Sequence, residues 1–138
     1  MEFNTYFYEV AKQAAAAAAE KDLTIDPKWI YSQWNHETGA FTSELQASNH
    51  NLGGLCQSEP NDTPQPDGNC YYMNFDTFED YATYFGHYLG YYVENGIDSA
   101  TTLYDYLVAL KNGGYFGDSL DNYYNDCQYI LDNTDFGE

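Results

Sequence analysis

The chain has 138 residues, of which 43% are hydrophobic and 19% aromatic, including 16 Tyr and 8 Phe. This length fits one domain with its own core, and the aromatic content excludes a disordered acidic chain. The formal net charge is −18, from 22 Asp and Glu against four Lys and no Arg. Binding to nucleic acid needs a cationic surface, so we expect none. The charge leaves two classes open: a soluble acidic protein, or a DNA mimic that occupies the basic groove of another protein.

No membrane segment is expected. The longest apolar run, Ala14 to Ala19, is much too short to cross a bilayer. The N-terminus lacks a basic region followed by an apolar one, so no signal peptide is predicted. Export would then use another route, or the sequence is a mature or excised segment.

Six segments carry helical signals. The second has the clearest beginning, because Asp26 is a good N-cap and Pro27 fits the first helical position. Gly39 fits a left-handed cap at its end. The predicted helices run from Glu2 to Asp22, from Asp26 to Gly39, from Thr42 to Ala47, from Asp76 to Gly96, from Asp98 or Ser99 to Gly113, and from Asp118 to Leu131.

Residues 49–75 have a different composition, with three of the four Pro and several Gly and Asn. We expect a loop here, with at most a short hairpin around Asp67-Gly68 that leads into Cys70 to Met73. No internal repeat and no linker divides the sequence. The prediction is therefore one α-dominated domain over residues 1–138.

The three cysteines, Cys56, Cys70 and Cys127, cannot all pair within one chain. Cys56 and Cys70 flank the loop segment, so a disulfide that staples this loop and three reduced thiols are both compatible with the sequence. No Cys-x-x-Cys occurs, which argues against a zinc site or a redox pair. No metal and no organic cofactor is predicted.

Glu37 is the residue whose position indicates chemistry. Ile30, Trp34 and Glu37 lie at i, i+4 and i+7, so they share the helix face that is expected to pack inward. Apolar surroundings and the negative end of the helix dipole both favour a protonated carboxyl group. Such a group can protonate a glycosidic oxygen. The alternative is a solvated Glu at a frayed helix end, which is the commoner case.

Other catalytic motifs are missing from the sequence. His36-Glu37 begins an H-E-x-x-H motif, but Ala40 stands where the second His would be. No G-x-S-x-G and no phosphate-binding glycine loop occurs. The acidic C-terminal end lacks the ligand spacing of a calcium loop and is predicted to be solvated.

The segment HETGAFTSELQASNHNLGGL, residues 36–55, resembles the signature of the glucosaminidase-type peptidoglycan hydrolases of the lysozyme-like superfamily. Glu37-Thr38-Gly39, Ser43-Glu44-Leu45, and Asn51-Leu52 with Gly54 match its three parts. Downstream, YYMNFDTFEDYATYFGHYL and GGYFGDSLDNYYNDCQYIL resemble the family's aromatic segment and closing helix. The resemblance covers roughly residues 26–131, with the pieces in the right order.

The resemblance implies a mainly α, lysozyme-like domain of about six helices, with a short loop or β-hairpin lobe over the cleft. It implies hydrolysis of the β-1,4 glycan backbone of peptidoglycan at the bacterial cell wall, by an N-acetylglucosaminidase or a muramidase, or cleavage by a lytic transglycosylase. Glu37 would be the general acid, and Tyr115 would lie near the reacting sugar. Asn51 would fix the loop lining the cleft, and Gly54, Tyr71 and Tyr72 complete the expected substrate-binding set.

The sequence departs from the family pattern at two positions. His50 stands where Asn is usual, and Gly53 where Phe is usual. The insert between Leu55 and Phe75 is also shorter than in many members, and a second carboxylate is often expected in it. The candidates for this carboxylate are Glu59, Asp62 and Asp67. The choice between a distant base and assistance by the substrate's acetamido group stays open.

Two other classes of function remain. One is a non-catalytic module that binds the cell wall or has a structural role, and the other is the acidic DNA mimic. The negative charge and the lack of a signal peptide favour delivery in a fixed assembly, such as a bacteriophage tail or a conjugation machine. Proteins of that assembly would then be partners besides the glycan strands.

Overall fold

The computed structural model describes residues 2–57, 63–64 and 71–137. This part is mainly helical, as predicted, and no helix in it is long and apolar enough to span a membrane. Within these residues the α-helices are α1 (Thr5–Ala19), α2 (Pro27–Glu37), α3 (Glu44–Asn49), α4 (Phe78–Tyr88), α5 (Leu103–Asn112) and α6 (Leu120–Asp132).

The first turn of each α-helix is capped by a short polar side chain. Asp26 accepts a hydrogen bond from the backbone N–H of Lys28 at 2.9 Å, so the predicted beginning of α2 is confirmed. Such a cap satisfies a backbone N–H that has no partner within the helix. The other caps are Asn4, Ser43, Thr77, Thr102 and Ser119.

Two predicted helices differ from the structure. The helix predicted to reach Gly96 ends as an α-helix at Tyr88 and continues as the 3₁₀-helix η1 (Leu89–Asn95). Leu89 and Tyr92 are both buried, and their spacing of three residues suits three residues per turn. The predicted start near Asp98 is a separate 3₁₀ turn, η2 (Ile97–Ser99), and α5 begins only after Thr102.

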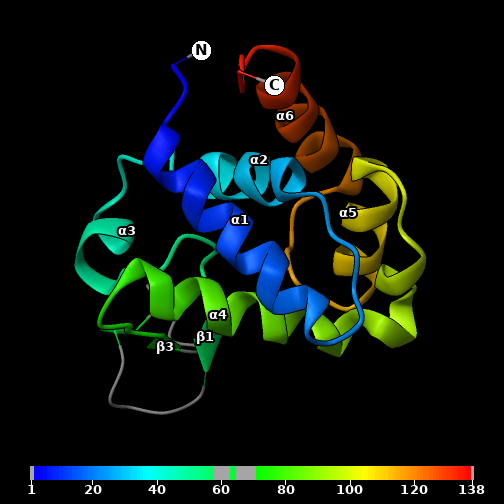
Figure 1. Cartoon of the computed structure of the whole chain (residues 1–138), viewed down its shortest axis with the longest axis horizontal. Helices are drawn as coiled ribbons and strands as arrows, with labels where there is room; N and C mark the ends of the chain where they lie inside the picture. The colour runs from blue at the N-terminus through cyan, green and yellow to red at the C-terminus, as the bar shows by residue number, and fades with distance from the viewer. Residues whose placement is uncertain (1, 58–62, 65–70, 138) are drawn as a thin grey trace.

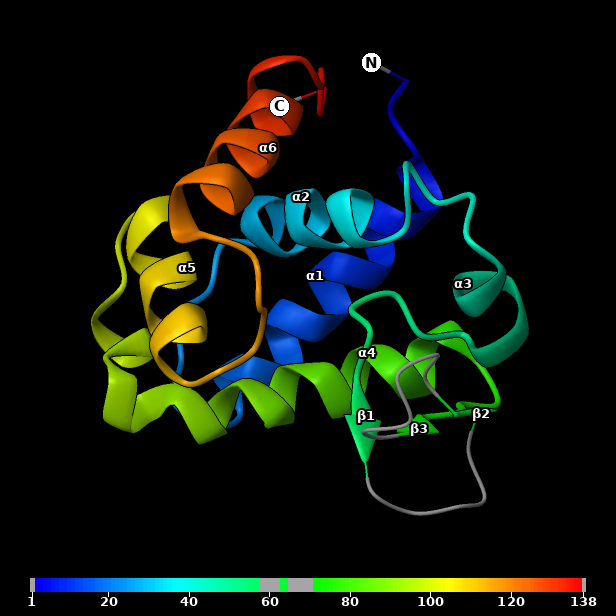
Figure 2. The ribbon, with the colours of Figure 1, turned by 180° about the vertical axis from the view of Figure 1, so that it is seen from behind.

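A small antiparallel sheet projects from the helices. Its strands are β1 (Cys56–Gln57), β2 (Thr63–Pro64) and β3 (Tyr71–Tyr72), in the order β1-β3-β2. Cys56 and Thr63 both lie opposite Tyr72. The predicted turn at Asp67-Gly68 lies outside the described residues. Figure 2 shows the strands beside α4, with the loop after α3 leading into β1.

The helices are arranged around α2. This helix packs against α1 on one side and α6 on the other, while α4 crosses α1, and α5 packs against α6 and η1. Figure 1 shows α1 running diagonally across α2 and down to α4. Six consecutive residues of α2, from Ile30 to Asn35, are buried. The core is unusually aromatic, and its largest buried side chains are Trp34, Tyr31, Tyr81, Tyr106, Tyr123 and Phe85.

The alanine-rich sequence of α1 allows α4 to approach it closely. Ala14, Ala17 and Ala18 are buried and face Gly86 of α4. A Cβ atom at Gly86 would lie 2.6 Å from the Cβ of Ala17 and 2.8 Å from the backbone nitrogen of Ala18. Both distances are shorter than the closest approach of packed, non-bonded atoms. The two helices therefore touch through backbone and methyl groups.

Substitution of Gly86 by Ala should force α1 and α4 apart. Overpacking of this kind costs about 1–3 kcal/mol, and the gain of about 1 kcal/mol in helix propensity offsets only part of it. We expect a lower free energy of unfolding, measured by urea denaturation. Gly90→Ala is the matched control, because a Cβ there would meet no atom within 4 Å. A Gly86→Ala variant as stable as the wild type would contradict this close packing.

Candidate active site

Glu37 occupies the last turn of the central helix. On the same helix face, Ile30 and Trp34 are fully buried, as the spacing predicts. Glu37 differs from the prediction of an inward-facing residue, because it lies where this face leaves the core and its side chain is solvent-exposed. A rigid, buried helix thus presents an accessible carboxylate.

The Glu37 carboxylate faces a surface hollow of about 330 Å³. The hollow lies between the end of α2, the loop before β1, strand β3 and the loop that joins α5 to α6. A mixture of aromatic rings, glycines and a few polar groups surrounds it. Its lining residues are His36, Glu37, Gly53, Gly54, Tyr72, Tyr115, Phe116, Gly117, Asp118 and Tyr123.

Tyr123 holds the carboxylate in place. Its hydroxyl donates a hydrogen bond of 2.6 Å to Oε1 of Glu37, which joins α6 to the end of α2. The Tyr123 ring stacks on Phe116, with centroids 3.9 Å apart, and the His36 ring meets it edge-on at 4.6 Å. Tyr123 is 86 residues from Glu37 in the sequence, so no local pattern indicates the pair.

The environment raises the pKa of the Glu37 carboxyl above its ordinary value. The main cause is loss of hydration, because protein surrounds the carboxylate except where it faces the hollow. The hydrogen bond from Tyr123 and the nearby His36 oppose this shift, since both stabilise the charged form. The protonated carboxylic acid is therefore populated to a higher pH than that of a solvated Glu.

The loop before β1 supplies the opposite wall of the hollow. Asn51 is fully buried, and its amide donates to the carbonyl oxygens of Leu55 at 2.8 Å and Met73 at 3.1 Å. Its Oδ1 accepts from the N–H of Leu55 at 3.1 Å. Asn51 thus fixes the loop from inside. Gly54 has a positive φ of 70°, and a Cβ there would lie 3.8 Å from Oε2 of Glu37.

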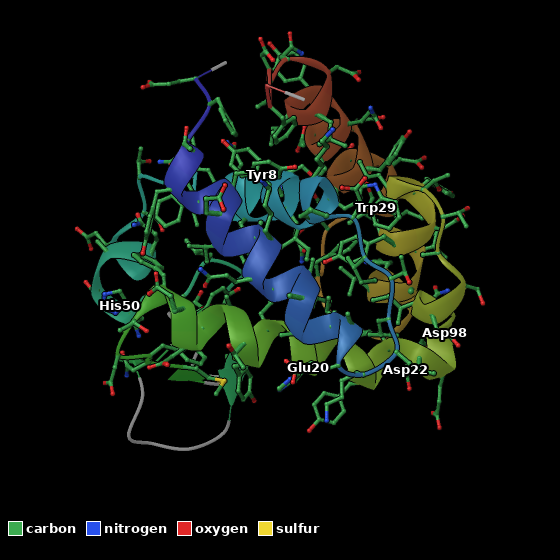
Figure 3. The ribbon with its side chains drawn as sticks, viewed as in Figure 1. Tyr8, Glu20, Asp22, Trp29, His50 and Asp98 are labelled. Carbon is green, nitrogen blue, oxygen red and sulfur yellow. The ribbon has the colours of Figure 1, made fainter. Side chains whose placement is uncertain are left out.

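The structure gives a physical reason for both departures from the family pattern. A side chain at Gly53 would meet the hydroxyl of Tyr81 at 2.6 Å, so tyrosines occupy the space that a Phe would need. His50 has a left-handed backbone with φ 50°, a conformation that Asn and His adopt more readily than most residues. Its Nδ1 lies 2.8 Å from the carbonyl oxygen of Phe75, and Figure 3 shows it at the end of α3.

Tyr115 lines the hollow from the loop between α5 and α6. Its hydroxyl donates a hydrogen bond of 2.7 Å to the carbonyl oxygen of Gly53. Burial raises the pKa of Tyr115 well above its ordinary value, so the phenol stays protonated. Tyr115 therefore ties the two walls of the hollow together as a neutral donor.

Several predicted site residues thus meet in one place. Glu37, Gly54, Tyr72 and Tyr115 all line the hollow, and Asn51 lies directly behind it. The side chain of Tyr71 and the three proposed second carboxylates, Glu59, Asp62 and Asp67, lie outside the described residues. The structure adds Asp118, Phe116 and Tyr123, which the sequence did not single out.

Neither Cys56 nor Cys127 lines the hollow. Cys56 is disulfide-bonded, whereas Cys127 is a free thiol in the core. Burial raises the pKa of Cys127 to about 12, so this thiol is neutral. Cys70 lies outside the described residues, and its pairing with Cys56 stays a prediction. Among the residues described, no group of three His, Cys, Asp or Glu side chains is placed to hold a metal ion.

Comparisons with known proteins identify the family and the fold. The family model Glucosaminidase, described as mannosyl-glycoprotein endo-beta-N-acetylglucosaminidase, matches residues 13–135. No curated protein sequence matches the chain. Among solved structures, the catalytic domain of the autolysin Auto from Listeria monocytogenes has the same fold, with a TM-score of 0.63 and 17% identity. The match covers 96% of this chain and 86% of that one. The chain therefore belongs to the Glucosaminidase family, as the resemblance in its sequence predicts.

Proposed function

We propose that this protein hydrolyses the β-1,4 glycan backbone of peptidoglycan at the bacterial cell wall, with Glu37 as its general acid. Family membership supports a glycoside hydrolase acting on this polymer. The observation that carries the assignment of Glu37 is its position in the hollow, solvent-accessible and held by Tyr123 at 2.6 Å.

The chemistry follows from the raised pKa of Glu37. The protonated carboxyl donates its proton to the glycosidic oxygen as the bond from this oxygen to the anomeric carbon breaks. The leaving sugar departs as an alcohol, and the Glu37 carboxylate that remains accepts the hydrogen bond from Tyr123. Water then adds to the anomeric carbon, which completes the hydrolysis. The proton released in this step restores the carboxylic acid.

The shape and lining of the hollow suit a saccharide. Tyr72, Tyr115 and Phe116 supply aromatic surface for the apolar faces of pyranose rings. Gly53 and Gly54 leave the backbone accessible beside the carboxylate. Of the residues that line the hollow, Asp118 is the other one with a carboxylate, and its Oδ1 accepts a hydrogen bond from the N–H of Ser119 at 2.7 Å. Asp118 is therefore the candidate among the described lining residues for a group that orients the attacking water, whose released proton returns to Glu37.

Replacement of Glu37 by Gln should abolish most of the activity. The amide keeps the shape of the side chain but cannot donate the proton, so we expect turnover to fall by about 10²–10⁴-fold. The measurement is mass spectrometry of fragments released from purified peptidoglycan. Glu44→Gln is the matched control, because Glu44 is exposed at the start of α3 and does not line the hollow.

The fragments also identify the reaction. Reducing ends at N-acetylglucosamine define a glucosaminidase, those at N-acetylmuramic acid a muramidase, and anhydro ends a lytic transglycosylase. Equal release by the wild type and Glu37→Gln would remove Glu37 from the mechanism. If the wild type releases no fragments across several wall chemistries and pH values, the hydrolase proposal is wrong and a non-catalytic wall-binding module takes its place.

The pH dependence of kcat/KM should respond to Tyr123. A general acid works while protonated, so activity falls as the pH rises through the pKa of Glu37. The Tyr123 hydroxyl lowers this pKa, and Tyr123→Phe should therefore raise it and move the alkaline limb to higher pH. Phe keeps the ring that stacks on Phe116. Tyr124→Phe, the next residue on α6, is the control. An alkaline limb that moves to lower pH would contradict this role.

A further inference from the structure

A second surface hollow, of about 470 Å³, lies along α4 and η1 rather than at Glu37. Its lining residues are Lys21, Tyr84, His87, Tyr88, Gly90 and Tyr91. Tyr84, Tyr88 and Tyr91 are spaced i, i+4 and i+7, so they form one row, here called the tyrosine strip. Figure 3 labels Glu20 and Asp22, the sequence neighbours of Lys21, where the end of α1 meets this part of the chain.

The tyrosine strip is exposed yet ordered. Tyr91 is 77% exposed and Tyr84 is 40% exposed. The rings of Tyr84 and Tyr88 stack with an interplanar angle of 18°, and Tyr91 meets Tyr88 edge-on at 5.4 Å. A contiguous apolar patch on a surface marks a contact with another molecule more often than isolated exposed residues do. The three rings thus form one ordered aromatic patch on the surface.

The strip adjoins the candidate active site. The ring of Tyr88 lies 6.2 Å from that of Tyr115, which lines the hollow at Glu37. The hydroxyls of Tyr88 and Tyr92 are 3.0 Å apart, and the Tyr92 ring also contacts Tyr115 at 6.0 Å. A continuous set of aromatic rings thus leads from the Glu37 hollow to the strip.

We propose that the tyrosine strip is a second glycan-binding surface, which holds sugar units of the same peptidoglycan strand away from the bond that is cut. The inference rests on the proposed function for the identity of the ligand. Tyrosine offers a flat apolar face and a polar tip, which suits a pyranose ring with its apolar face and hydroxyl rim. A net charge of −18 argues against a nucleic-acid strand as the occupant.

Lys21 gives the strip a cation that can bind a carboxylate of the strand. Lys12 pairs with Glu9 at 3.3 Å, Lys111 donates to the carbonyl oxygen of Asp118 at 2.7 Å, and Lys28 lies over the Phe136 ring. For Lys21, the described part of the chain shows no hydrogen bond or ion pair. Its ammonium group is therefore free to bind a carboxylate, such as one on a stem peptide.

The test measures binding in a Glu37→Gln background, so that the strand is not cut. The probe is glycan strands freed of peptides by an amidase and fractionated by length, with affinity measured by calorimetry. Tyr91→Ala and Tyr84→Ala should each weaken binding of long strands by about 2–10-fold. The affinity for a disaccharide, measured in the same variants, should change less than the affinity for long strands. Tyr129→Ala is the matched control, since Tyr129 is also exposed, at 60%, but lies on α6.

A blocking variant tests the surface without removing a tyrosine. Gly90 lines the hollow and a Cβ there would meet no atom within 4 Å, so Gly90→Leu adds a side chain at the hollow without a clash at its Cβ. It should also weaken binding of long strands. Lys21→Gln should also weaken binding of these strands, because an amidase leaves a lactyl carboxylate on each N-acetylmuramic acid. Circular dichroism is the check that each variant is folded.

The outcomes separate this inference from the proposed function. Unchanged affinity for long strands in Tyr91→Ala and Gly90→Leu would overturn the inference, even if the wild type cleaves peptidoglycan. Loss of affinity in both variants would support it, even if no cleavage is found and Glu37 has no catalytic role. A dimer in sedimentation that Tyr91→Ala abolishes, with glycan affinity unchanged, would assign the strip to a second copy of the chain and overturn the inference.

Discussion

The burial of α2 between α1 and α6 is the constraint on which the site depends. Because the helix is enclosed from Ile30 to Asn35, its last turn has a fixed position and Glu37 leaves the core at a defined point. Tyr123 lies on α6, which packs against α2, and its hydroxyl donates a hydrogen bond to the Glu37 carboxylate. The geometry of the candidate site is thus a consequence of core packing. The alanine face of α1 contributes to it, since small side chains let α4 close the other side of the core.

Opposing effects act on the Glu37 carboxyl, and their balance matters more than either one. Loss of hydration favours the acid, whereas the Tyr123 hydroxyl and the nearby His36 favour the carboxylate. A general acid needs both forms, because it gives up a proton in one step and must regain it later. A fully buried carboxyl would hold its proton too tightly, and a fully solvated one would lose it too early. The exposure of Glu37 to the hollow places it between these limits.

Local signals in the sequence predicted the features that depend on neighbouring residues. The cap at Asp26, the helix through Trp34 and the hollow residue Gly54 follow from capping chemistry, helical spacing or a short motif. The beginning of α5 was missed because Thr102, rather than Asp98, accepts from the first turn, after the separate turn η2. The partnership of Tyr123 with Glu37 was missed for a different reason. It joins helices distant in sequence, and in a chain with 16 tyrosines no single one is distinguished by composition.

The abundance of tyrosine also explains how so acidic a chain can offer binding surface to a glycan. With four lysines against 22 acidic residues, long-range attraction of an anionic polymer is not available, so affinity must come from short-range contacts. Aromatic rings supply such contacts without charge, and Tyr72 and Tyr115 place them beside Glu37. The same argument applies to Tyr91, whose exposed ring has no structural role in the core. On the proposed function, a cut strand would be held by uncharged stacking contacts that are individually weak, and it would leave as each of them breaks.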